Sequence, residues 1–259
     1  MYTVRPGDTL YSIANGFGAS LEAIVQANAL YPPVTDPNLI HPGWKLLIRL
    51  PGMSEQSAVL HQVTEGDTFF RLAERYSVGL DLLLALNPTE TPDILRVAQL
   101  LYIPAFVYEA EQGDSLYRIS RHFGIPMDRI VRANAGRPGF SPDLIYPGYR
   151  LAIPLPSSTN ILVYEPLPGG RIEAGQMMGG LARAFEANVL YSIIDDRGEL
   201  VGRERFVTAS EGAPAYGQFR APLILDRKPS TPGGTLRVYT RSPRDGSIQD
   251  LVEVRVDFG

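Results

Sequence analysis

Cysteine is missing from this 259-residue chain, so disulfides, thiolate metal sites and cysteine nucleophiles are excluded. No apolar run reaches the roughly 18 residues that a membrane-spanning helix needs. Basic residues do not predominate: 24 lysines and arginines face 28 acids, for a net charge of -4. That balance argues against nucleic acid or an anionic membrane as the main partner. The three histidines, His41, His61 and His122, lie far apart, without the spacing of metal ligands or a catalytic triad.

A motif that recurs three times is the main positive signal. It reads Gly7-Asp8-Thr9-Leu10, then Gly66-Asp67-Thr68-Phe69, then Gly113-Asp114-Ser115-Leu116. Each copy follows a short β-type run and precedes apolar residues at helical spacing. A glycine, an acid and a hydroxyl at such a junction predict a sharp turn and a helix N-cap. Because a repeat decides the whole architecture, the chain is divided on this motif.

Each copy opens a unit that reads strand, helix, helix, strand. Glycine is expected to end the first helix, at Gly18, Gly79 and Gly124. Asparagine is expected to end the second, because it tolerates the left-handed conformation, at Asn28, Asn87 and Asn134. We place the units at residues 1–52, 60–105 and 106–156. A polar linker over residues 51–57 is long enough for independent motion, whereas residues 104–106 should couple the second and third units closely.

These units resemble LysM domains, the lysin-motif modules that bind N-acetylglucosamine-containing glycans such as peptidoglycan and chitin. The resemblance rests on three motifs: the Gly-Asp-Thr/Ser-Leu opening, the asparagine that ends the second helix, and the Asp-Pro-Asn-Leu-Ile-His-Pro-Gly stretch at 36–43, which recurs in similar form at 141–148. The resemblance implies a groove between the loop that opens the first helix and the loop before the last strand. There, backbone groups would bond the acetamido group over an apolar floor.

Carried onto this chain, the resemblance implies three glycan-binding grooves. The first would be formed by Gly7, Asp8, Thr9 and Leu10 facing Asn38, Leu39, Ile40 and His41. The second would be formed by Gly66, Asp67, Thr68 and Phe69 with Asp93, Ile94, Leu95 and Arg96. The third would be formed by Gly113, Asp114, Ser115 and Leu116 facing Asp143, Leu144, Ile145 and Tyr146. The alternative is that the aspartates only cap the helix and that the leucines and Phe69 only fill the core.

Two positions depart from the family pattern. The second unit has Val97-Ala98 where the others have Pro-Gly, so we expect a differently shaped loop and weaker binding there. Trp44 and Tyr149 stand where the family usually shows glutamine, which Gln99 keeps. Aromatic rings at these positions suit either stacking on a sugar or packing between units.

Helical spacing ends near Ile161, and short strands then alternate with turns such as 195–198 and 244–246. About seven strands at this spacing predict an antiparallel β-sandwich over residues 160–259. Pieces such as Glu165-Pro166, Gly179-Gly180-Leu181-Ala182 and Asp245-Gly246-Ser247 resemble the immunoglobulin-like domain of bacterial spore germination proteins. The expected fold class is therefore multidomain α+β: three small βααβ LysM modules plus a C-terminal all-β immunoglobulin-like sandwich.

The function that the resemblance implies is non-catalytic binding of peptidoglycan or chitin, with no cofactor and no metal, at the cell wall or spore envelope. Residues 160–259 would contact another spore or envelope protein. Two alternatives stay open: a structural spore-coat or scaffold protein, and an accessory subunit of a cell-wall hydrolase. No signal peptide precedes the strand expected at Tyr2. Assembly from the mother-cell cytoplasm is therefore expected, unless a leader has been lost.

Overall fold

The computed structural model describes the chain except for residues 29, 31–34, 37–38, 49–58, 90 and 93, which include the linker predicted over 51–57. The described residues fall into two units. One holds most of residues 1–154, and the other holds residues 155–259 with 78–85 and 121–125. Within the described ranges, no helix is both long and apolar enough to cross a membrane.

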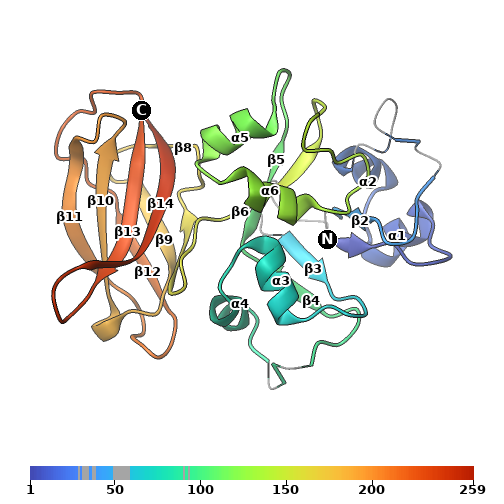
Figure 1. The fold of residues 1–259 in the computed structure, drawn as a ribbon, viewed down its shortest axis with the longest axis horizontal. Coiled ribbons are helices and arrows are strands. Elements are labelled where there is room, and N and C mark those ends of the chain that lie inside the picture. Colours follow the sequence, from blue (N-terminus) through green and yellow to red (C-terminus); the bar gives the residue numbers. More distant parts are fainter. Residues whose placement is uncertain (29, 31–34, 37–38, 49–58, 90, 93) are drawn as a thin grey trace. The chain divides into compact units, whose positions relative to one another are not determined.

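Each of the three repeat units folds as strand, helix, helix, strand, with its two strands paired antiparallel (Figure 1). The first module contains β1 (Tyr2–Thr3), α1 (Leu10–Phe17), α2 (Leu21–Ala27) and β2 (Lys45–Leu46). The second contains β3 (Val59–Gln62), α3 (Phe69–Tyr76), α4 (Leu80–Leu86) and β4 (Leu100–Ile103). The third contains β5 (Ala105–Glu109), α5 (Leu116–Phe123), α6 (Met127–Asn134) and β6 (Arg150–Pro154). The predicted element order is confirmed in all three.

The first helix of each module begins at the hydroxyl residue of the motif. Thr9 Oγ1 accepts from the backbone N–H of Ser12 at 3.0 Å, and the Ser12 hydroxyl accepts from the backbone N–H of Thr9, also at 3.0 Å. The two bonds complete a capping box. Thr68 and Ser115 accept from the third helical N–H of α3 and α5 in the same way. Each cap is worth about 1 kcal/mol.

The other end of the first helix is left-handed. Gly18 (φ 61°) and Gly124 (φ 66°) occupy this position in the first and third modules, as predicted. In the second module the position is taken by Ser77, at φ 53°, and not by Gly79. The prediction was wrong there because only glycine signals a left-handed residue in a sequence, whereas packing can hold another residue in that conformation at a cost.

The core of the first module follows the helical stripe that the sequence predicts. Its buried residues come from both strands and both helices: Tyr2, Val4, Ile13, Ala14, Ile24, Leu30 and Leu46. Each fully buried aliphatic side chain contributes roughly 1.5–3 kcal/mol. A set this small leaves little margin, so the polar contacts that close the module matter.

Those polar contacts come from the asparagine at the end of the second helix. Asn28 Nδ2 donates to Ile24 O at 2.9 Å and to Leu47 O at 2.8 Å, while its Oδ1 accepts from Leu47 N at 2.7 Å. Asn134 joins α6 to Ala152 in the same manner, and Asn87 pairs with Tyr102. The reason given from the sequence was wrong: Asn28 has φ -119°, so it is not left-handed. Its side-chain amide instead bonds both backbone groups of Leu47, directly after β2, as a neighbouring strand would.

A buried guanidinium joins the first and third modules within their unit. Arg137 is 4% exposed and stacks 4.9 Å above the Tyr149 ring. It donates to Asn134 Oδ1 at 3.0 Å in its own module, and to Ala27 O at 3.1 Å and Asn28 Oδ1 at 3.3 Å in the first module. Burial away from water lowers the pKa of Arg137, and the neutral oxygens around the guanidinium oppose this by solvating its charge.

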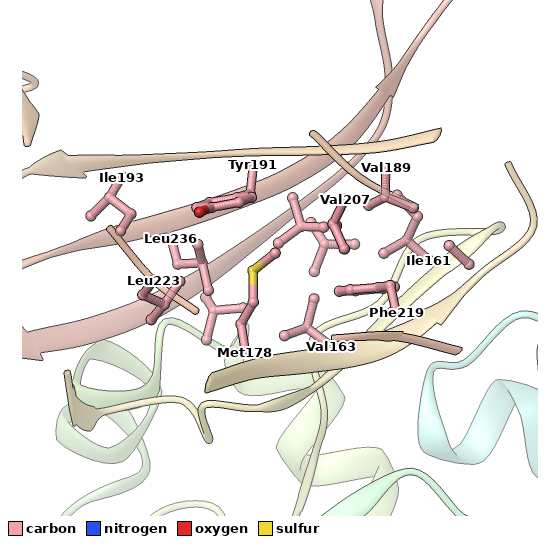
Figure 2. Packing of buried hydrophobic residues seen from close by; sticks show 14 of the residues in the cluster. Ile161, Val163, Met178, Val189, Tyr191, Ile193, Val207, Phe219, Leu223 and Leu236 are labelled. Carbon is pink, nitrogen blue, oxygen red and sulfur yellow. The ribbon is translucent and has the colours of Figure 1, made fainter. Parts of the chain in front are cut away.

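Residues 160–259 form two sheets that enclose one core. The five-stranded sheet runs β11 (Leu200–Thr208), β10 (Asn188–Asp195), β13 (Gly233–Arg241), β14 (Ile248–Phe258) and β8 (Gly170–Ile172). The three-stranded sheet runs β12 (Gly217–Pro222), β9 (Met177–Ala182) and β7 (Ile161–Glu165). Figure 2 shows Val163, Met178 and Phe219 of the smaller sheet packing against Tyr191 and Leu236 of the larger. The sandwich is as predicted, except that the short β8 pairs parallel with β14 in a domain expected to be antiparallel throughout.

Candidate functional site

The first module carries a surface cavity of about 470 Å³ where the groove is expected. It lies between the opening turn and the loop before β2, with the start of α2 beside it, and its walls are Asp8, Thr9, Leu10, Tyr11, Leu21, Val25, Leu39 and Ile40. Five of the predicted residues are therefore brought together. Gly7 and His41 are not in the cavity wall, and Asn38 lies outside the described residues.

The opening turn needs its glycine. Gly7, Gly66 and Gly113 have φ values of 86°, 85° and 88°, which L side chains rarely adopt. Each turn closes with a backbone bond from the aspartate N–H, for example Asp8 N to Arg5 O at 3.1 Å. Because the three turns have the same conformation, they present the same row of backbone groups at the start of the first helix.

The aspartates tie this turn and do not cap the helix, which corrects the capping interpretation. Each carboxylate accepts from the backbone N–H three residues earlier, at 2.7 Å for Asp8, 2.8 Å for Asp67 and 2.8 Å for Asp114. Each also accepts from a side chain of the first strand: Tyr2 Oη, His61 Nε2 at 3.0 Å and Tyr108 Oη at 2.7 Å. These side chains hold the turn to the strand beneath it.

The second module uses histidine where its neighbours use tyrosine. Burial lowers the pKa of His61, although the bond to Asp67 opposes this, and its Nδ1 lies 3.0 Å from Tyr76 Oη. Burial works to raise the pKa of Asp67, but the bonds from His61 and Thr64 outweigh it and hold the pKa well below its usual range. In the first module, burial and the bond to Asp8 raise the pKa of Tyr2 to about 12. In all three modules the bonds of the aspartate carboxylate stabilise the turn.

The turn directly before the last strand has a left-handed residue at the same place in all three modules. Gly43, Ala98 and Gly148 have φ values of 90°, 73° and 81°. Each N–H donates back to the first strand's end, with N–O distances of 2.8 Å to Val4, 2.9 Å to Val63 and 2.7 Å to Ala110. At this turn the expected difference in the second module is wrong, because Ala98 adopts the left-handed conformation that glycine adopts elsewhere. Weaker binding in the second module stays a prediction, but this turn does not support it.

The predicted apolar residues divide by exposure into a buried or half-buried set, called the floor, and an exposed set, called the rim. Phe69, Leu116 and Ile145 are buried, and Leu10, Ile40 and Leu95 are half-buried, so they belong to the core as much as to the surface. Leu39, Ile94 and Leu144 are exposed by 49%, 63% and 53%. Ile94 and Arg96 line a separate cavity of about 550 Å³ made by the loop before β4 alone. Asp93 lies outside the described residues.

The remaining predicted residues lie on the outer side of their loops. Gly66, Thr68, Gly113, Ser115, Asp143 and His41 are exposed, and Tyr146 is half-buried. The His41 ring meets Trp44 edge-on at 4.9 Å, and Trp44 packs on the core of its module. Tyr149 is 1% exposed and donates from its hydroxyl to Pro138 O at 2.9 Å, so it packs inside and does not face a sugar.

An exposed aromatic ring beside the groove was missed from the sequence. Tyr11, Phe70 and Tyr117 are the second residues of α1, α3 and α5, and their side chains are exposed by 69%, 59% and 64%. Tyr11 lines the cavity of the first module. The signal was present, because an aromatic residue follows the Gly-Asp-Thr/Ser-Leu/Phe motif in every copy, but the apolar stripe directed attention to the buried face.

Comparison with known proteins accounts for both parts of the chain. The LysM domain model matches residues 2–49, 61–104 and 108–154. The model described as the immunoglobulin-like domain of bacterial spore germination matches residues 160–247.

Several curated proteins are similar over part of their length. The secreted LysM effector ECP6 of Passalora fulva is 30% identical over 40% of this chain and 44% of that protein. The probable autolysin SsaALP of Staphylococcus aureus is 35% identical over 33% of this chain and 34% of its own length. The putative sporulation-specific glycosylase YdhD of Bacillus subtilis is 33% identical over 40% and 22%. This chain thus spans less than half the length of each of them.

Among solved structures, the Bacillus cereus spore cortex-lytic enzyme SleL is 33% identical over 40% of this chain and 22% of that chain, with a TM-score of 0.29. The family models cover both the repeats and the sandwich, in the order that the fold shows. The protein belongs to the LysM family, and its three LysM domains are followed by an immunoglobulin-like domain of the bacterial spore germination type.

Proposed function

We propose that the protein binds peptidoglycan through its LysM domains without cleaving it, with chitin as the alternative glycan. LysM domains as a family bind N-acetylglucosamine-containing glycans, and this chain has three. The observation that carries the proposal is the groove of the first module, where a rigid backbone turn and exposed apolar side chains lie together. A neutral acetamido sugar needs these two features: amide-like hydrogen bonding and an apolar surface for its methyl group.

Three modest sites on one chain bind a polymer better than one. Once the first module is bound, the others meet the same glycan strand at an effective concentration in the millimolar range, so avidity can exceed single-site affinity by about 10²–10⁴. A long glycan supplies the repeated sugars this requires. The proposed location is therefore the cell wall or spore envelope, and the proposed task is anchoring. The immunoglobulin-like domain would hold a second spore or envelope protein there.

The experiment is sedimentation of the full chain with purified peptidoglycan. The test variant combines Leu39→Ser, Ile94→Ser and Leu144→Ser, which removes one exposed apolar side chain from the loop before the last strand of each module without touching a buried side chain. The matched control is Leu200→Ser in β11, whose side chain is 46% exposed in the sandwich. We expect the wild type and the control to sediment. The test variant should bind about five- to tenfold more weakly per site, because each loses one exposed apolar contact.

Two results would oppose the proposal. A wild-type chain that stays in the supernatant would favour the scaffold alternative, in which the LysM modules contact proteins. Release of soluble glycan fragments from the pellet would show cleavage. Similarity to a probable autolysin and a putative glycosylase favours a second candidate function, that of an accessory to a cell-wall hydrolase. Co-purification of the tagged chain with a hydrolase activity would support that candidate.

A further inference from the structure

The immunoglobulin-like domain has a surface cavity of its own, at the end of the sandwich where β10 begins and β11 ends. Its volume is about 600 Å³, which is within the range of sites that hold small ligands. Three segments form its wall: the connection from β9 to β10, the hairpin from β13 to β14, and the outer face of β10 and β11. On that face Leu190 pairs with Phe206. Both alternate with the core residues Val189 and Val207, so they point away from the core.

Two segments of the cavity wall have a strained backbone. Glu186 and Ala187, in the connection from β9 to β10, have φ values of 51° and 59°, and Asp250 in β14 has φ 51°. Left-handed residues other than glycine cost free energy, and they persist where the surroundings hold them, often at binding sites. Here Ala187 O accepts from Ala209 N at 2.8 Å, and the Asp250 carboxylate accepts from Asn160 at 2.9 Å. The shape of the cavity is therefore fixed without a ligand.

The charged side chains of the wall are paired within the domain. Arg241 donates to the Glu204 carboxylate at 2.6 Å. Arg183 donates to Asn160 Oδ1 at 2.8 Å, and Asn160 donates to Asp250, so the amide links the guanidinium to the carboxylate. Because each of these cations is linked to an acid, the cavity suits an uncharged ligand.

A ligand would meet two phenyl rings and two amides. Phe185 and Phe206 line the cavity and are exposed by 65% and 72%. Asn188 and Gln249 also line it, are exposed, and make no side-chain hydrogen bond to any other described residue. An extended peptide offers one N–H and one C=O for each peptide group, which one side-chain amide can bond together. A pyranose presents more hydroxyls than two amides can bond, so a peptide fits this wall better than a sugar.

We infer that this cavity binds an extended, uncharged peptide segment of a partner protein. An apolar side chain of the segment packs against Phe185 and Phe206, and its backbone bonds the amides of Asn188 and Gln249. Aromatic-lined grooves recognise extended segments, proline-rich ones above all, in this way. The inference rests on the proposed function, because it locates the surface that would hold a second envelope protein. Removing about 60 Å² of each ring from water corresponds to about tenfold in Kd.

The first step of the test selects a peptide on the full chain. The probe is a library of random dodecapeptides displayed on phage, and the variant with Phe185→Ser and Phe206→Ser serves for counter-selection. Both side chains are largely exposed, so the variant should fold as the wild type does. We expect the selected peptides to share an apolar anchor with uncharged neighbours.

The second step titrates one selected peptide, made synthetically, into the full chain by NMR. It should shift the amide signals of Asn188 and Gln249, and each single serine variant should bind it about tenfold more weakly. Asn188→Ala and Gln249→Ala should each weaken binding by about threefold to tenfold. The affinity should change less than about twofold between about 0.05 and 0.5 M salt, because the site has no unpaired charge. The matched control is Leu200→Ser, 46% exposed at the other end of β11, which should bind as the wild type does.

The outcomes separate the inference from the proposed function. Failure to select a peptide that prefers the wild type to the double serine variant would overturn the inference, and so would unchanged affinity in the ring or amide variants. If an N-acetylglucosamine oligomer shifts the Asn188 and Gln249 signals, the cavity is a glycan site and the inference fails. Sedimentation with peptidoglycan tests the proposed function separately, because the double serine variant keeps all three LysM modules and should sediment. A chain that binds the peptide but stays in the supernatant would refute only the glycan binding.

Discussion

Truncation of the helix-ending asparagine should cost very different amounts in the second and third modules. Asn134 is fully buried, and its amide makes four hydrogen bonds, to Ile130 O, Ala152 O, Ala152 N and Arg137 Nη1, at 2.8 to 3.0 Å. Asn134→Ala leaves all four groups short of a partner away from water. At roughly 1 kcal/mol for each bond, the free energy of unfolding of the third module should fall by about 4 kcal/mol.

Asn87 makes the same exchange with Tyr102, at 2.9 Å and 2.6 Å, but it is only half-buried. Water can replace the amide in Asn87→Ala, so we expect a loss of about 1–1.5 kcal/mol. Because a chain of several domains does not unfold in one step, the measurement is amide hydrogen exchange of β6 and β4 in the full chain. Protection should fall by about three decades in β6 and about one in β4.

Asp128→Ala is the control, since this carboxylate is 63% exposed and its ion pair with Arg132 is worth little. It lies in the same helix as Asn134 and should leave β6 protection within a factor of about two. Equal losses in the two asparagine variants would refute the reasoning, because burial would then not decide the cost of the unmade bonds.

Two further predictions concern substitutions that give the second module the residues found at the same positions in the other modules. Ala98→Gly should stabilise the second module by about 0.5–1 kcal/mol, because the left-handed strain at φ 73° costs more than the extra chain entropy of glycine in the unfolded state. The reverse change Gly43→Ala should destabilise the first module for the same reason. A fall in the hydrogen-exchange protection of β4 in Ala98→Gly would contradict this prediction. His61→Tyr with Tyr76→Phe recreates the Tyr2–Phe17 pairing of the first module. Because the pKa of His61 is lowered in the folded protein, the unfolded state binds more protons once the pH falls below the usual value of about 6.5. Protection of β3 in the wild type should therefore fall as the pH drops from 7 to 5, and the double variant should lose this dependence. A double variant with the same pH profile as the wild type would refute this prediction.

Much of the site is readable because it depends on local geometry. Three copies of Gly-Asp-Thr/Ser identify a turn that needs positive φ and a hydroxyl that caps the next helix, and both are found. The apolar stripe identifies the buried face in the same way, since helical periodicity alone determines which side chains share a face. The family resemblance, the βααβ order and the sandwich follow from such patterns.

Where the sequence was misleading, the cause was a long-range contact. Asn28 and Asn134 look like helix ends, but their amides are bound to a strand 18 or 19 residues away. Tyr149 looks like a ring available to a sugar, yet Arg137 and Pro138 cover it. Ser77 and Ala98 adopt left-handed conformations that no residue preference predicts.

By itself, then, the sequence determined the repeat and the turn conformation, because both rest on backbone dihedrals and spacing within a few residues. The class of ligand to expect came from the resemblance of the repeat to LysM domains. Tertiary structure alone decided which of the marked side chains are buried in the core and which face the groove. It also showed that the rings of Tyr11, Phe70 and Tyr117 are exposed beside the motif. Burial depends on what other segments cover, and that information is spread over residues far apart in the chain.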